Sequence, residues 1–109
     1  MENTIIALIK EYNGGRYGTM GVSVARVEPT FFKNGKIKKM HFHIVEELKT
    51  LKKGYGYGNC VHTEVIDRIL SEEDLQKVNE FNYDRVGKIS SWMTREELFP
   101  SNKADTGTK

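Results

Sequence analysis

Two segments in the first half of the chain, residues 20–28 and 37–45, alternate apolar and polar residues over most of their length and are rich in β-branched side chains. This two-residue period is typical of strands. Asn34-Gly35 lies between the two segments. Asn-Gly is the strongest short-range signal for a two-residue hairpin loop, because a type I′ turn needs positive φ at both central positions. The pattern predicts an antiparallel hairpin that turns at Asn34-Gly35.

A two-residue loop also fixes which residues of the hairpin face each other. It predicts that Glu28 lies opposite His41 and that Arg26 lies opposite His43. Pro29 cannot donate to the ladder and should mark an edge, a bend or a bulge. The apolar residues expected on one face are Ala25, Val27, Met40, Phe42 and Ile44.

The segment before this hairpin fits two kinds of element. Ile5, Leu8, Ile9 and Tyr12 have helical spacing. The same residues, followed by Asn13-Gly14-Gly15, also fit a strand that leads into a turn. The content of isoleucine, threonine and tyrosine favours the strand.

Helical signals dominate the second half of the chain. Residues 46–53 end in lysines before Gly54, which predicts a short helix there. Residues 63–70 carry an apolar stripe with helical spacing, and Thr63 can cap this helix. Ser71 with Asp74, and Thr94 with Glu97, have the spacing of capping boxes. The helix that Ser71 opens is expected to bury Leu75, Val78 and Phe81, and residues 86–92 are expected to form a last short strand.

Together these elements predict an α+β fold, in which an N-terminal antiparallel sheet is followed by two or three short helices. Residues 1–100 are expected to form a single globular domain. Residues 101–109 carry no large apolar side chain. They are expected to be a disordered C-terminal tail.

Composition excludes several classes of protein. The net charge of +2 is too small for a dedicated polyanion binder. The single cysteine, Cys60, cannot form an intramolecular disulfide and points to a reducing compartment. The apolar run at residues 5–9 is far shorter than the roughly 20 residues of a membrane span, and Met1-Glu2-Asn3 does not resemble the start of a signal peptide. We therefore expect a cytoplasmic location.

Charge is nevertheless divided along the chain. Residues 33–53 carry a local charge of +5 and residues 64–84 a local charge of −5. Such runs are most often solvated faces, but they also suit a molecule that presents its basic half to an anion or associates with a second copy.

The sequence offers weak support for a metal site or a catalytic centre. The side chains that could bind zinc are those of His41, His43, Cys60 and His62. Their spacing does not match that of ordinary structural zinc sites. Cys60 lacks the glycine-rich surroundings of a nucleophile elbow. We therefore expect that the protein binds no metal and no cofactor and that it is not an enzyme.

Residues 52–59 are the most unusual stretch, because three glycines alternate with two tyrosines just after two lysines. Glycine lets a ligand approach the backbone, tyrosine offers a π-face and lysine offers charge to phosphate. The simpler interpretation is a flexible connector or a glycine-weakened edge strand. Basic and aromatic residues also adjoin at Arg16-Tyr17 and at Phe31-Phe32-Lys33.

These patterns predict a small non-catalytic protein that binds an anionic, nucleotide-like molecule, acting by sequestration or sensing. An accessory or inhibitor protein of the phage or mobile-element type, acting by protein–protein contact through the acidic half, is the alternative. Nucleic-acid binding is the third hypothesis for the function.

A homo-oligomer, first of all a dimer, is expected from the open sheet edges. The predicted ligand-binding residues are Arg16, Tyr17, Arg26, Lys39, His41, His43, Lys52, Lys53, Tyr55 and Tyr57.

Overall fold

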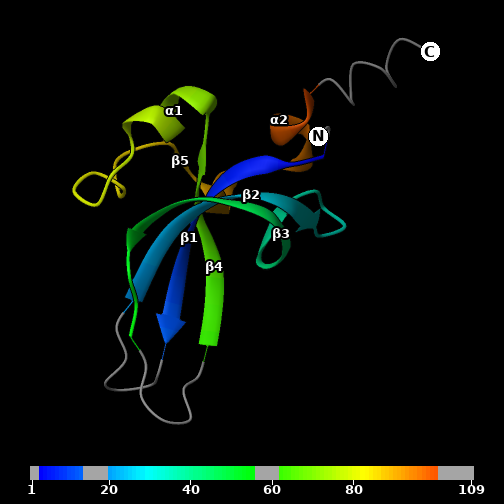
Figure 1. Cartoon of the computed structure of the whole chain (residues 1–109). Coiled ribbons are helices and arrows are strands. Elements are labelled where there is room, and N and C mark those ends of the chain that lie inside the picture. Colours follow the sequence, from blue (N-terminus) through cyan, green and yellow to red (C-terminus); the bar gives the residue numbers. More distant parts are fainter. Residues whose placement is uncertain (1–2, 14–19, 56–61, 101–109) are drawn as a thin grey trace.

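The computed structural model describes residues 3–13, 20–55 and 62–100 of the 109-residue chain. Five strands form one antiparallel sheet in the order β3-β2-β1-β4-β5 (Figure 1). The strands are β1 (Ile5–Asn13), β2 (Met20–Phe31), β3 (Ile37–Lys52), β4 (His62–Leu70) and β5 (Lys88–Ile89). The other elements are the helices α1 (Glu72–Lys77) and α2 (Arg95–Leu98) and the 3₁₀ turn η1 (Ser90–Trp92).

The predicted antiparallel sheet is confirmed, and the segment at residues 5–13 is a strand rather than a helix. The helical part is smaller than predicted. It consists, in the described part of the chain, of two short helices and one 3₁₀ turn, which is not a clear α+β layout. None of the described helices is long and apolar enough to cross a membrane.

β1 lies at the centre of the sheet and is buried on both of its faces. Ile5, Ala7 and Ile9 belong to one apolar cluster, which Met93 and side chains of the α2 region complete. Ile6 and Leu8 belong to a second cluster on the other face, which Val78 and Leu75 of the α1 region complete. The chain's own C-terminal segments therefore cover both faces, which explains why the first strand reads as a continuous apolar run.

The prediction of a helix over residues 63–70 is wrong, because these residues form β4, which pairs with β1. The register shifts between Leu8 and Ile9, so that Ile9 pairs with Ile66 and Ala7 pairs with Ile69. The extra residue on β4 brings two isoleucines three positions apart onto the same face of the sheet, in the same cluster. A bulged strand thus reproduces the i, i+3 spacing of a helix.

The prediction of a helix over residues 46–53 is also wrong, because this segment continues β3, which has 16 residues. β3 is longer than the stretch of β2 that it faces. Phe31 pairs with Ile37 and Val22 pairs with Lys52, and the register shifts at four places between them. Bulges on an outer strand bend it and increase its twist, so β3 arches over the sheet (Figure 1).

The hairpin turns where the sequence predicts, but with a different loop. Phe32 N–H donates to Lys36 O at 2.8 Å and Gly35 N–H donates to Phe32 O at 2.9 Å. The loop therefore has three residues, and Gly35 is its one residue with positive φ, at 92°. A three-residue loop of this kind places a single left-handed residue after the turn.

The longer loop and the bulges overturn the predicted register. Glu28 pairs with His43 rather than His41, and Arg26 pairs with Glu46 rather than His43. An irregularity does occur next to Pro29, as predicted. Two expected core residues are exposed: Met40 (59%) on β3 and Phe81 (78%), which lies beyond the end of α1. Both predicted helix caps, Ser71 and Thr94, are confirmed, and the strand expected at residues 86–92 is limited to β5.

Candidate functional site

The turn of the β2–β3 hairpin is tied to the C-terminal segment by three hydrogen bonds, two of which form the bridge between Lys36 and Thr94. Lys39 Nζ donates to Ser91 Oγ at 3.1 Å. Ile37 N–H donates to Met93 O at 3.2 Å, and Arg95 N–H donates to Gly35 O at 2.8 Å. Segments more than fifty residues apart in the sequence therefore lie side by side.

Lysines and exposed aromatic rings lie on and next to these two segments. We define the hairpin surface as Phe32, Lys36, Lys38, Lys39 and Trp92. Trp92 is 72% exposed and Phe32 is 55% exposed. Lys38 Nζ lies 5.3 Å from the centre of the Phe32 ring, within the range of a cation–π contact. Large aromatic side chains that remain exposed beside cations can stack on a planar ligand.

The sequence identified one member of this surface, Lys39, as a ligand-binding residue. Trp92 was missed, because nothing local connects residue 92 to a lysine on a distant strand. Its only signal is its type: it is the single tryptophan of the chain.

The other predicted ligand-binding residues do not gather at this place. His41 and His43 are exposed on β3, and His43 pairs with Glu28. Lys52, Lys53 and Tyr55 lie at or beyond the opposite end of the same strand, a contour of roughly 40 Å from Lys39 at the usual strand rise. Arg16, Tyr17 and Tyr57 lie outside the described residues, as do Cys60 and residues 56–59 of the glycine–tyrosine stretch.

Arg26 has a partner and a cavity of its own. Its guanidinium lies 3.6 Å from Glu72 Oε2. It lines a cavity of about 430 Å³ together with Lys88 and the acidic residues Glu72, Asp74 and Glu97. The acidic groups outnumber the basic ones among these five, so the charges at this cavity do not favour an anion.

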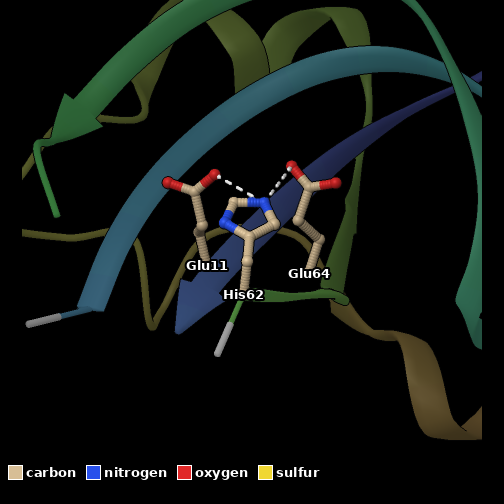
Figure 2. A group of neighbouring side chains, drawn as sticks. All are labelled: Glu11, His62 and Glu64. Carbon is tan, nitrogen blue, oxygen red and sulfur yellow. Dashed lines mark ion pairs between the residues drawn. The ribbon is translucent and has the colours of Figure 1, made fainter. Parts of the chain in front are cut away.

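A separate polar cluster lies at the far end of the sheet, where β1 ends and β4 begins (Figure 2). His62 Nε2 lies 3.3 Å from Glu11 Oε2 and 3.9 Å from Glu64 Oε2. Its other ring nitrogen, Nδ1, lies 2.8 Å from Asn13 Oδ1. The sequence pointed to His62 as a ligand type but missed both glutamates, which are brought together only by the pairing of β1 with β4. His41 and His43 join no such cluster among the described residues.

No model of a protein family matches the chain, and no curated protein or solved structure matches it either.

Proposed function

We propose that the chain is a non-catalytic binding protein for an anionic, nucleotide-like small molecule, and that the ligand binds at the hairpin surface. The contact between Lys39 and Ser91 carries this proposal. Trp92 follows Ser91 directly, so its backbone lies next to the residue that Lys39 contacts, and its side chain is exposed.

The chemistry of this surface suits both parts of a nucleotide. A base stacks on an indole with a free energy of about 1–3 kcal/mol, and the stacking tolerates different bases. Lys36 and Lys39 are exposed and lie at or next to the start of β3, where their ammonium groups supply positive charge for a phosphate group. The small net charge of +2 favours a small anion over a long polyanion.

Trp92 provides its own reporter, because the chain has one tryptophan. We would titrate the protein with ATP, AMP and inorganic phosphate at low salt and follow the tryptophan emission. Stacking of a base should quench or shift the emission with ATP and AMP, and phosphate alone should leave it unchanged. Saturation should also raise the melting temperature, since a ligand that binds the folded state stabilises it.

Two variants and a control test whether the ligand binds at the hairpin surface or elsewhere on the molecule. Lys39→Gln should weaken binding roughly tenfold to a hundredfold, as expected for loss of a hydrogen bond from a charged group. Trp92→Ala should weaken binding roughly fivefold to a hundredfold, and so reduce the ligand-dependent rise in melting temperature at a given ligand concentration. Lys77→Gln removes an exposed lysine of α1 and should bind like the wild type. A wild-type protein whose emission and melting temperature do not respond to ATP or AMP would rule out this site, and so would a rise in melting temperature that is the same in all four proteins.

A second candidate function is contact with a protein partner through the acidic half. Phe81, 78% exposed, follows α1, whose first turn carries Glu72, Glu73 and Asp74. Aromatic residues, phenylalanine among them, are enriched in protein interfaces. Replacing the three acidic residues should remove partner binding and leave the tryptophan response intact. Nucleic acid is the third candidate ligand. If the affinity for an oligonucleotide fell steeply with salt concentration, nucleic-acid binding would be favoured over the other two functions.

Self-association is a further, independent proposal. The apolar faces of the sheet are covered by the chain itself, so a second copy would pair along the outer edge of β3. The lysines and bulges of that edge oppose such pairing. Light scattering that gives 12.5 kDa at high concentration would exclude the dimer.

A further inference from the structure

The antiparallel register of β1 and β4 brings four polar side chains together at one end of the sheet. Asn13 pairs with His62 and Glu11 pairs with Glu64, so the alternation of the strands places all four side chains on one face. One ligand atom from each of Glu11, His62 and Glu64 lies within 4.8 Å of the other two (Figure 2). We propose that these three residues form a binding site for a divalent transition-metal ion, with zinc as the probe.

The two distances from His62 Nε2 to the carboxylates are close to those between ligands of a small ion. Zinc binds imidazole nitrogen and carboxylate oxygen at about 2.0–2.2 Å, so neighbouring ligands of a tetrahedral site lie about 3.4 Å apart. His62 Nε2 and Glu11 Oε2 are 3.3 Å apart. His62 Nε2 and Glu64 Oε2 are 3.9 Å apart, which requires a closure of about 0.5 Å by a flexible side chain that is 35% exposed.

Asn13 orients both the imidazole and one of the carboxylates. Its Oδ1 lies 2.8 Å from His62 Nδ1, so it accepts a hydrogen bond from an Nδ1–H and leaves the lone pair of Nε2 for a metal. Its Nδ2 donates to Glu11 Oε1 at 3.3 Å, while the other oxygen of that carboxylate faces His62. Hydrogen bonds from a second residue to the ligating groups are typical of metal sites.

A cation also satisfies this arrangement better than a single proton does. Two carboxylates converge on one nitrogen, His62 Nε2, in Figure 2. A proton on that nitrogen points toward one carboxylate at a time, whereas a divalent ion binds both oxygens and the nitrogen together. Imidazole with carboxylate favours zinc and similar ions over magnesium and calcium, which prefer oxygen ligands.

The site is also accessible. The side chains of His62 and Glu11 are 55% and 33% exposed. Three protein ligands leave at least one position of a four-coordinate ion for water, as in open zinc sites. The site lies at the end of the sheet where β1 ends, away from the β2–β3 turn that carries the hairpin surface, so it is independent of the proposed anion site.

The test is a zinc titration of the full chain, freed of metal beforehand, against a competing chromophoric chelator, with native mass spectrometry for stoichiometry. We expect one zinc ion per chain and no comparable response to magnesium. Cobalt should bind at the same place and give visible absorption bands that change when a ligand is removed.

Four variants decide which residues bind the ion. His62→Ala and the isosteric Glu64→Gln should lower zinc affinity by more than roughly a hundredfold, and Asn13→Ala by roughly tenfold to a hundredfold, the usual effect of a residue that orients a ligand. His43→Ala removes an exposed histidine that pairs with Glu28 on another strand and should bind zinc like the wild type. Circular dichroism of each variant checks that the fold is retained.

Two results would overturn the proposal. One is a wild-type protein that binds no zinc at micromolar concentration, in which case the cluster is a set of ion pairs only. The other is zinc binding that survives Glu64→Gln, or that falls equally in His43→Ala. The conservative Glu64→Gln variant keeps the test decisive even where His62→Ala fails to fold.

Discussion

Lys49 Nζ donates a hydrogen bond to the carbonyl oxygen of Val78 at 3.1 Å and so joins the edge strand β3 to the end of α1. The same ammonium donates to Leu75 O at 2.7 Å. The last carbonyls of a helix have no partner within the helix, and a cation is favourable beside them. α1 has six residues, too few to be stable alone. It is held by the lysine and by the packing of Leu75 and Val78 on the sheet.

Lys49→Met keeps the aliphatic stem of the side chain and removes the ammonium. We expect it to lower the free energy of unfolding by about 1.5–3 kcal/mol, because both carbonyls lose a charged donor. Urea unfolding followed by circular dichroism measures the change. Lys52→Met alters an exposed lysine on the same strand and should change stability by less than about 0.5 kcal/mol. Equal effects of the two substitutions would show that the carbonyl contacts add nothing.

Gly35 and Gly87 have similar backbone conformations but different surroundings. Their φ angles are both positive, at 92° and 82°. A Cβ at Gly35 meets nothing within 4 Å, whereas one at Gly87 would lie 2.5 Å from Ile69 O and clash with Leu70. Gly35→Ala should therefore cost about 1–2 kcal/mol, the strain of the left-handed backbone alone.

Gly87→Ala should cost roughly 3 kcal/mol or more, since the steric overlap adds to that strain. Thermal or urea unfolding of the two variants gives the difference directly. If Gly87→Ala is no more destabilising than Gly35→Ala, the close packing of residue 87 against β4 is incorrect.

Ser90 is the one buried polar residue in the described part of the core, at 1% exposure, and its Oγ donates to Ile66 O at 2.7 Å. Ser90→Ala should reduce stability by about 1–2 kcal/mol, because a buried carbonyl loses its hydrogen bond. Ser91→Ala, at the neighbouring position, loses only an exposed hydrogen bond from Lys39 and should reduce stability by less than Ser90→Ala does. The reverse order of the two effects would contradict the position of η1 against β4.

Leu8 is fully buried at the centre of the sheet, with 0% exposure. Leu8→Ala should cost about 2.7–5 kcal/mol, since both the lost apolar contacts and the remaining cavity destabilise the fold. Tyr12→Ala, on the same strand but 48% exposed, should cost much less. Similar losses for the two would mean that β1 does not occupy the centre of the core.

The sequence by itself determined the features that depend on neighbouring residues. The strand at residues 5–13, the location of the hairpin turn and the helix caps at Ser71 and Thr94 follow from β-branched content, glycine and hydrogen bonds within a few positions. These are local energies, and no distant part of the chain is needed to express them.

Only the tertiary structure decided the rest. The bulge opposite Leu8 and Ile9 lets Ile66 and Ile69 share a face, so a spacing typical of a helix became a strand paired with β1. The bulges of β3 set the register against β2, which turn chemistry cannot specify beyond the loop. The Lys39–Ser91 contact and the cluster of Glu11, His62 and Glu64 join residues about fifty positions apart. Their proximity depends on strand order and register, and these are fixed by burial of the whole sheet rather than by any local pattern.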